Sequence, residues 1–310
     1  MFHHFHDEKN HKKGQGSISK DDFYNLINFI GRKNILNADT FYQKLKEKKL
    51  KENEVCFTFD DAIKCQIDVA LPILEDLKIK SFFFVHTSMH EGKHDYLEIF
   101  RHFRLNYFED INDFYSIFFK NLNKDLNSFF KKNENLILER KKRYSFYSLE
   151  DIKFRLVRDI LLNKKDYEEH MFKLMDIKKF DHNKIISSLF FSKNDIVSLD
   201  NLGHCIGLHS HSHPTLLEKL NYDEQKKEYS QNFKFIHKIL NKPKRKIFAC
   251  SHPLGSYNDD TLKILSELGI ELAFKDNISI EKDRGMKKIN NSFLEIARKD
   301  HSEIIKSMVK

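Results

Sequence analysis

The sequence contains no tryptophan and little proline, glycine or cysteine, with 4 Pro, 9 Gly and 4 Cys among 310 residues. No internal repeat, low-complexity tract or proline-rich linker divides the chain. The four cysteines are scattered without a C-x-x-C pair, which argues against a disulfide framework. Because scattered, unpaired cysteines are typical of reducing compartments, we expect a cytoplasmic protein with free thiols.

Long apolar runs are also absent. No segment approaches the roughly 20 apolar residues that a transmembrane helix needs, so we expect no transmembrane segment. The first seven residues, from Met1 to Asp7, are rich in histidine and lack the apolar stretch of a secretory signal. Both absences favour the cytoplasmic localisation.

The balance of charge is basic, with a net charge of +8 and a sequence pI of about 9.0. Such a balance favours anionic partners, including ligands that carry phosphate. Acidic residues are interspersed almost everywhere, however, and no basic and aromatic stripe of the nucleic-acid-binding type is present. We therefore expect no nucleic-acid partner.

Short apolar runs alternate with amphipathic stretches, which predicts an α/β fold with a mostly parallel sheet. The seven expected strands are Phe2–Phe5, Val55–Phe59, Ser81–His86, Cys205–His209, Ile247–Ser251, Glu271–Phe274 and Leu294–Ala297. The expected helices around them are Lys20–Ile30, Thr40–Lys49, Ile63–Leu77, Tyr222–Leu240 and Asp260–Leu268. Ser19 is a candidate N-cap, and Pro72 is expected to kink or divide its helix.

The stretch 94–191 has a different composition from the rest. It has almost no glycine or proline and carries Phe, Leu, Lys and Asp at helical spacing, as in Phe114, Ile117 and Phe118. This pattern predicts a mainly helical insertion. Its aromatic residues are better explained by internal packing than by a ligand site, although some of them could line a substrate groove.

Two carboxylates, Asp60 and Asp61, follow the apolar run Val55–Phe59. In parallel α/β folds the carboxyl ends of strands carry the loops that build active sites. Two adjacent anions in one site are costly unless a cation lies between them, which a metal would supply. The alternative is a simple turn in which Asp61 caps the following helix.

Three histidines, His209, His211 and His213, follow a second apolar run within five positions. In a turn His209 and His213 meet on one face, whereas in an extended segment all three would share a face. Pro214 directly after them indicates that the strand breaks into a turn, which favours the pair. One carboxylate and two imidazoles can hold a divalent metal and leave a position open for water. A single histidine here would instead be a satisfied core residue.

A third apolar run leads into the turn His252-Pro253-Leu254-Gly255. Pro253 fixes its own backbone angle and Gly255 permits close approach of the backbone. Pro253 lacks an N–H group, so Leu254 is the candidate donor to an oxyanion.

In this order the three segments resemble the polysaccharide deacetylases with a NodB homology domain, carbohydrate esterase family four. That family carries Thr-Phe-Asp-Asp, then His-Ser/Thr-x-x-His-Pro, then a Pro-x-Gly turn, which here read Thr58–Asp61, His209–Pro214 and Pro253–Gly255. The resemblance implies a distorted (β/α) barrel of about seven strands. Residues 1–310 would then form one catalytic domain, interrupted by the helical insertion.

The resemblance also implies roles for individual residues. Asp61, His209 and His213 become ligands of one divalent ion, most simply Zn²⁺ with Co²⁺ or Ni²⁺ as substitutes, and Asp60 becomes the catalytic base. His211 falls on a variable position and is not expected to bind the metal.

The sequence departs from the family pattern in three ways. The gap between Asp61 and His209 is long, His252 replaces the usual Arg or Tyr, and the late Leu-x-His segment that supplies the general acid is not evident. Near the position expected for the Leu-x-His segment, the sequence has Arg298, Asp300 and His301. The sequence leaves His4, His252 and His301 open as candidates for the acid.

The function that follows is removal of an N-acyl group, most simply N-acetyl, from an amino sugar of a glycan or glycan precursor. A precursor linked to a nucleotide or lipid phosphate suits the expected localisation. The alternative is an inactive sugar-binding or scaffolding module in glycan assembly, which the missing Leu-x-His segment favours.

Overall fold

The computed structural model describes residues 1–92, 96–143, 146–241, 246–276 and 292–308. The chain divides into two compact units. The sheet unit contains residues 1–7, 18–95 and 187–310, and the helical unit contains residues 8–17 and 96–186. No helix among the described residues is long and apolar enough to cross a membrane.

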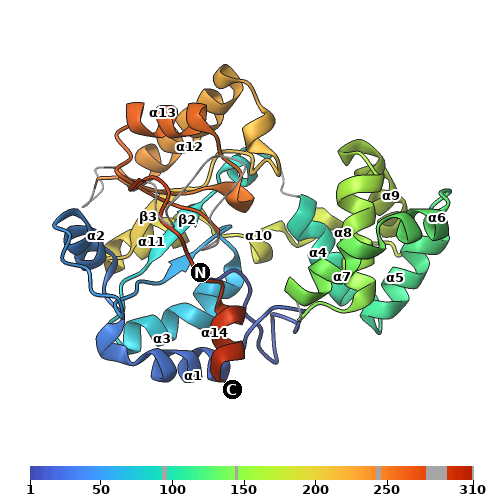
Figure 1. Ribbon diagram of the computed structural model, residues 1–310, viewed down its shortest axis with the longest axis horizontal. Helices are drawn as coiled ribbons and strands as arrows, with labels where there is room; N and C mark the ends of the chain where they lie inside the picture. The colour runs from blue at the N-terminus through green and yellow to red at the C-terminus, as the bar shows by residue number, and fades with distance from the viewer. Residues whose placement is uncertain (93–95, 144–145, 242–245, 277–291, 309–310) are drawn as a thin grey trace. The chain divides into compact units, whose positions relative to one another are not determined.

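The sheet unit is built on five parallel strands that pair in chain order (Figure 1). Their bounds are β1 Thr58–Phe59, β2 Phe82–Val85, β3 Cys205–Leu208, β4 Ala249–Ser251 and β5 Leu272–Phe274. Every residue of these strands is buried, as expected for a sheet covered on both faces. Gly207 in β3 is required by packing, because a Cβ there would lie 2.5 Å from the Phe84 ring and 2.8 Å from the Ala249 carbonyl.

Two of the seven expected strands appear as single bridges, so a count of seven strands is not confirmed. Phe2 bridges to Phe59 at one edge of the sheet, and Ile296 bridges to Phe274 at the other. Each segment adds one residue pair to the sheet, which is too little for a ladder, and Phe5 forms a further bridge to Ile18 outside the five strands. The two edge segments also meet, since the N–H of His301 donates to the carbonyl of Met1 at 3.2 Å. The sheet is therefore a curled, half-barrel sheet of five strands.

Helices cover both faces of the sheet, with α12 and α13 on one side and α1 and α3 on the other (Figure 1). The helices of this unit are α1 Lys20–Ile30, α2 Ala38–Lys46, α3 Leu71–Asp76, α11 Lys193–Leu202, α12 Tyr222–Leu240, α13 Asp259–Glu267 and α14 His301–Met308. Both α1 and α12 have the predicted bounds, and Ser19 caps α1 in a capping box. The predicted helix Ile63–Leu77 is divided into a π-helical turn, η2 (Gln66–Ala70), and α3, with Pro72 in the first turn of α3.

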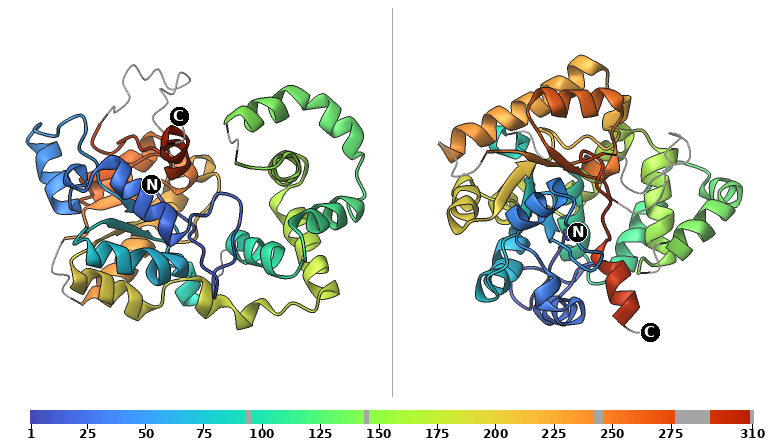
Figure 2. Two further views of the ribbon diagram at one scale, coloured as in Figure 1. Left: turned by 90° about the horizontal axis from the view of Figure 1, so that it is seen from below. Right: turned by 60° about the vertical axis from the view of Figure 1, so that its left-hand side comes forward.

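Phenylalanine side chains form much of the core of the helical unit. Its helices are α4 Tyr96–Asn106, α5 Ile111–Lys120, α6 Leu126–Lys132, α7 Glu134–Arg143, α8 Leu149–Leu156 and α9 Lys164–Ile177, and a short helix α10 (Ile186–Leu189) follows. Both α5 and α7 contact α8 (Figure 2). Phe103, Phe114, Phe118 and Phe154 are fully buried, which accounts for the aromatic spacing by internal packing. Residue 94, the predicted start of the insertion, lies outside the described residues.

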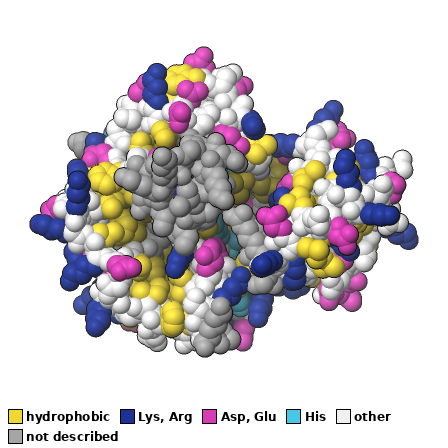
Figure 3. Space-filling view, viewed as in Figure 1, with side chains coloured by type: hydrophobic (Ala, Val, Ile, Leu, Met, Phe, Trp, Pro, Cys, Tyr) yellow, Lys and Arg dark blue, Asp and Glu magenta, His cyan; other side chains and the backbone are white. Residues whose placement is uncertain are grey.

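Charged side chains of both signs are mixed over the face of the molecule seen in Figure 3, where Lys and Arg alternate with Asp and Glu. This agrees with the charge pattern of the sequence, in which acidic residues interrupt the basic ones.

Candidate metal centre and active site

The candidate site lies at the carboxyl ends of the parallel strands β1, β3 and β4. Asp60 and Asp61 follow β1, His209 follows β3, and Ser251 is the last residue of β4. Because parallel strands end at the same edge, residues far apart in the sequence meet here.

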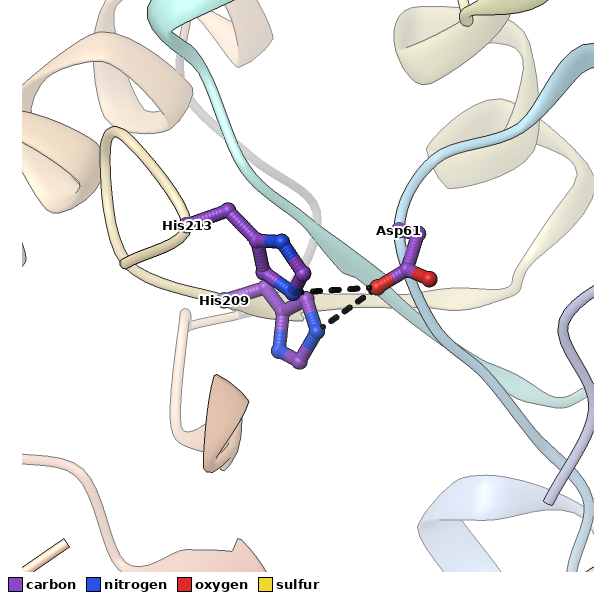
Figure 4. A group of neighbouring side chains, drawn as sticks. All are labelled: Asp61, His209 and His213. Atoms are coloured by element: carbon purple, nitrogen blue, oxygen red, sulfur yellow. Dashed lines mark hydrogen bonds and ion pairs between the residues drawn. The ribbon is translucent and has the colours of Figure 1, made fainter. Parts of the chain in front are cut away.

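One oxygen of Asp61 faces the imidazoles of both His209 and His213 (Figure 4). Its Oδ1 atom is 3.0 Å from Nε2 of His209 and 3.3 Å from Nε2 of His213. One donor atom from each of the three residues lies within 4.8 Å of the other two. Among the described residues, this is the one group of His, Cys, Asp and Glu side chains that meets this criterion for holding a metal ion.

The donor set fits a divalent metal ion. The ring of His209 donates from Nδ1 to the Ser251 carbonyl at 2.8 Å, which leaves Nε2 facing Asp61. Without a cation, that Nε2 atom could bond to the carboxylate only if the ring carried a second proton. With a metal, the Nε2 lone pair becomes a ligand, and the bond at Nδ1 fixes the tautomer as in known zinc sites.

The electrostatics of Asp61 agree with that assignment. Burial opposes its ionisation, but the charge of His213, the hydrogen bond with His209 and then His3 hold the pKa of its carboxyl well below the ordinary value. The carboxylate is therefore charged at neutral pH, as a metal ligand must be.

The loop that carries the histidines is held from α12. Glu228 accepts hydrogen bonds from the N–H groups of His211 and Ser212 at 2.9 and 2.7 Å. Asn232 accepts from the His209 N–H at 3.0 Å and donates to the carbonyl of Val85 at the end of β2. These contacts hold a backbone with positive φ at Ser210 and His213, +59° and +54°. Such conformations persist only where surrounding contacts impose them.

His211 is directed away from the three candidate ligands. Its Nδ1 atom lies 3.0 Å from Oγ1 of Thr87, and its Nε2 atom lies 3.5 Å from Glu91. The side chain thus links the histidine loop to the end of β2.

Asp60 is paired with Arg298, and both side chains are buried. The guanidinium donates to both carboxylate oxygens at 2.9 and 2.7 Å, and Ser251 donates to one of them at 3.0 Å. Burial opposes ionisation of Asp60, but Arg298 outweighs it and, with His209, sets the pKa of the carboxyl far below its usual range. Asp60 is thus a fixed, ionised carboxylate directly beside the candidate metal ligands.

A further histidine, His3, lies within about 4 Å of both carboxylates. Its Nε2 atom is 3.9 Å from Oδ2 of Asp60 and 4.0 Å from Oδ2 of Asp61, and its side chain is 29% exposed. His4 lies beside it, with ring centres 6.4 Å apart. His301 stacks on Phe2, and its Nδ1 atom is 3.6 Å from Asp300.

The turn after β4 is shaped as predicted, but His252 points into the protein. Its ring stacks on Tyr257 at 4.2 Å, and Nε2 lies 2.8 Å from the Leu294 carbonyl. Leu254 has φ of +51° and is 56% exposed. Gly255, at φ +70°, is required because a Cβ would lie 2.6 Å from the Asp276 carboxylate. The turn therefore presents Leu254 rather than His252 at the surface.

Sequence reasoning missed the positions of His3 and Arg298. Both reach the carboxylates through single bridges at the sheet edges, and the register of those bridges sets which side chain arrives. The pairing of Phe2 with Phe59 places His3 beside Asp60. A strand signal alone does not distinguish His3 from His4, because it carries no register.

A family model named Polysaccharide deacetylase matches residues 161–273 of this chain. That match confirms the resemblance. It covers the candidate ligands His209 and His213 and the turn Pro253–Gly255, but it does not extend to Asp60 and Asp61. A comparison with curated proteins finds no match.

Several solved structures share the fold. The structure of Streptococcus pyogenes deacetylase PplD in complex with acetate has a TM-score of 0.54 at 16% identity, covering 99% of this chain and 96% of that one. A de-N-acetylase from Aggregatibacter actinomycetemcomitans gives 0.53 at 13% identity, with 99% and 97% covered. IcaB from Ammonifex degensii gives 0.51 at 13% identity, with 96% and 87% covered. At these identities the likeness shows the fold alone.

Proposed function

We propose that this protein is a metal-dependent hydrolase that removes an N-acetyl group from an amino sugar of a glycan or glycan precursor. The observation that carries the proposal is the convergence of Asp61, His209 and His213 beside the ionised Asp60. The family match and the deacetylase fold support the class of reaction. Metal ligands and a separate carboxylate base are the parts that hydrolysis of an amide by water needs.

Each residue has a defined task in the proposed reaction. A divalent ion such as Zn²⁺, held by Asp61, His209 and His213, would lower the pKa of water toward about 7 and polarise the acyl carbonyl. Asp60 accepts the proton of the water whose oxygen attacks the carbonyl carbon. The N–H of Leu254 donates to the developing oxyanion. The C–N bond then breaks, the amine nitrogen receives a proton, and acetate and a free amino sugar leave.

We assign His3, in place of His4, His252 or His301, as the general acid that protonates the leaving nitrogen. Its imidazole lies about equally far from Asp60 and Asp61 and is partly exposed, so a substrate can reach it. His252 is held by the Leu294 carbonyl and His301 stacks on Phe2. The geometry therefore favours His3 over His252 and His301, and a comparison of His3→Ala with His4→Ala separates His3 from His4.

Three finer points stay proposals. The curled sheet is proposed to be a distorted barrel, supported by the edge bridges at Phe2 and Ile296 and the hydrogen bond between His301 and Met1. The substrate is proposed to carry a phosphate, supported by the net charge of +8. The protein is proposed to act in the cytoplasm, which cell fractionation would test.

The proposed function is tested by release of acetate. Protein reconstituted with one equivalent of Zn²⁺ is incubated with N-acetylated sugars, both free and phosphate-linked, and acetate is measured. We expect release from at least one of them. If no N-acetyl sugar is hydrolysed while the protein binds sugars, the chain is instead a binding or scaffolding module.

The role of His3 predicts a loss that depends on the leaving group. His3→Ala should reduce acetate release from an N-acetyl sugar by about 10²-fold or more, since general acid catalysis typically contributes 10²–10⁴-fold. Hydrolysis of 4-nitrophenyl acetate should change little, because nitrophenolate leaves without a proton. His4→Ala and His301→Ala are the matched comparisons. A loss of amide hydrolysis confined to either of them would contradict the assignment.

A further inference from the structure

Gln66 joins the two segments that carry the proposed proton donor and the base. Its side chain is fully buried at the start of the π-helical turn η2. The Nε2 atom donates to the carbonyl of His3 at 2.9 Å and to the carbonyl of Asp60 at 2.6 Å. One nitrogen atom thus fixes the backbone of His3 relative to the backbone of Asp60.

The chemistry of this contact requires a primary amide. Two carbonyl groups need two N–H donors, and the amide of glutamine supplies both from one uncharged nitrogen. Methionine has a similar length but no donor, and glutamate would direct acceptor oxygens at the two carbonyls. Because the site is buried, unpaired carbonyls there would not be satisfied by bulk water.

The backbone of the N-terminal segment is held on both sides of His3. The bridge to β1 holds Phe2 through its N–H and carbonyl groups, and beyond His3 the His4 carbonyl accepts from the N–H of Ile18 at 3.2 Å and the Phe5 N–H lies 3.3 Å from the Cys65 sulfur. Between them, His3 is held by the Gln66 amide and by a long contact of its carbonyl with Cys65 at 3.9 Å. The π-helical turn places Cys65 and Gln66 beside this segment, and such turns are frequent at functional sites.

We infer that Gln66 is a positioning residue that sets the imidazole of His3 against the carboxylate of Asp60 for amide hydrolysis. The inference rests on the proposed function, in which His3 protonates the leaving nitrogen. A misplacement of about 1 Å of a catalytic group can lower a rate by about 10²-fold. Gln66 is therefore expected to act on the step that needs the proton.

The test compares two substrates in full-length, Zn²⁺-loaded protein. Gln66→Met should lower kcat for an N-acetyl sugar by about 10²-fold, with KM nearly unchanged. It should lower hydrolysis of 4-nitrophenyl acetate by less than about 5-fold, because that leaving group needs no proton. Zn²⁺ affinity, measured by calorimetry, should stay at the wild-type value. If Gln66→Met does not fold, Gln66→Asn replaces it, since the shorter amide cannot reach both carbonyls.

The matched control is Gln225, which lies on α12 and, like Gln66, has a fully buried amide side chain. Its Nε2 atom donates to the Leu220 carbonyl at 2.9 Å and to Asn258 at 3.3 Å. Gln225→Met should affect both substrates by the same small factor. In the His3→Ala background, Gln66→Met should add less than about 3-fold to the loss of amide hydrolysis.

Three results separate the outcomes. Equal losses on both substrates, or losses that multiply fully with those of His3→Ala, would show that Gln66 acts only on structure and would overturn the inference. Wild-type protein that hydrolyses neither substrate would overturn the proposed function itself. If the wild type is active and Gln66→Met loses activity only on the N-acetyl sugar, the result supports both the proposed function and the positioning role of Gln66.

Discussion

Asp60→Asn is expected to lower acetate release from N-acetyl sugars by about 10²–10⁴-fold, the range that a general base typically contributes. The amide side chain has nearly the same shape as the carboxylate, but it cannot accept the proton of the attacking water. The pairing with Arg298 and Ser251 makes this residue the most firmly held carboxylate of the site. Because Asn removes the charge that pairs with the buried Arg298, the variant is also expected to lose stability, and its fold is verified before the kinetics are measured.

The same variant should keep its metal. Asp60 does not belong to the group formed by Asp61, His209 and His213, so Zn²⁺ affinity should remain close to the wild-type value. Kinetics and calorimetry on one preparation of Asp60→Asn measure both properties. Activity above about a tenth of wild type would mean that another group accepts the proton.

Arg298→Gln is expected to destabilise the fold most. Removing one partner of a buried ion pair typically costs about 3–5 kcal/mol, because the other charge stays buried. Arg298 is 6% exposed, Asp60 is 2% exposed, and the guanidinium also donates to the Lys275 carbonyl at 2.8 Å. Urea unfolding at neutral pH should show this loss. Arg298→Lys, which keeps the charge but not the paired geometry, should lose less.

The pH dependence of Arg298→Gln gives a sharper test than its magnitude. In the wild type the pKa of Asp60 lies below its usual range, so the pair contributes stability that is lost as pH falls through that pKa. Without Arg298, burial raises the pKa of the carboxyl, and the folded state loses stability as pH rises through the new value. The difference in unfolding free energy between the two proteins should therefore shrink from pH 7.5 to pH 4.5. A difference that stays constant over this range would contradict the role given to the pair.

The sequence predicts those parts of the site that depend on residues close together in the chain. The side chains that form the site directly follow apolar runs in the sequence; they are Asp60, Asp61, His209 and His213. Because parallel strands end at one edge of the sheet, these side chains are expected to lie close together. Likewise, α12 has its predicted bounds because Asn221 caps it in a capping box with Glu224, a local signal.

The partners that hold these residues were not predictable in the same way. Arg298 follows the segment at the opposite edge of the sheet. Gln66 belongs to a π-helical turn, and no spacing rule predicts such a turn from the sequence. The expected strands at Phe2–Phe5 and Leu294–Ala297 each pair with the sheet at one residue only, because their pairing depends on how the sheet curls. Register and curling are set by tertiary packing, which a local pattern does not contain.

The central claim is that Asp61, His209 and His213 hold one divalent ion, and the most direct measurement is the number of ions bound per chain. Protein stripped with a chelator is titrated with Zn²⁺, Co²⁺ and Ni²⁺, and the bound metal is also determined by elemental analysis. We predict one Zn²⁺ per wild-type chain, and loss of that ion in Asp61→Ala with the fold retained. A wild-type chain that binds none of the three ions, or an Asp61→Ala variant with wild-type metal content, would contradict the account.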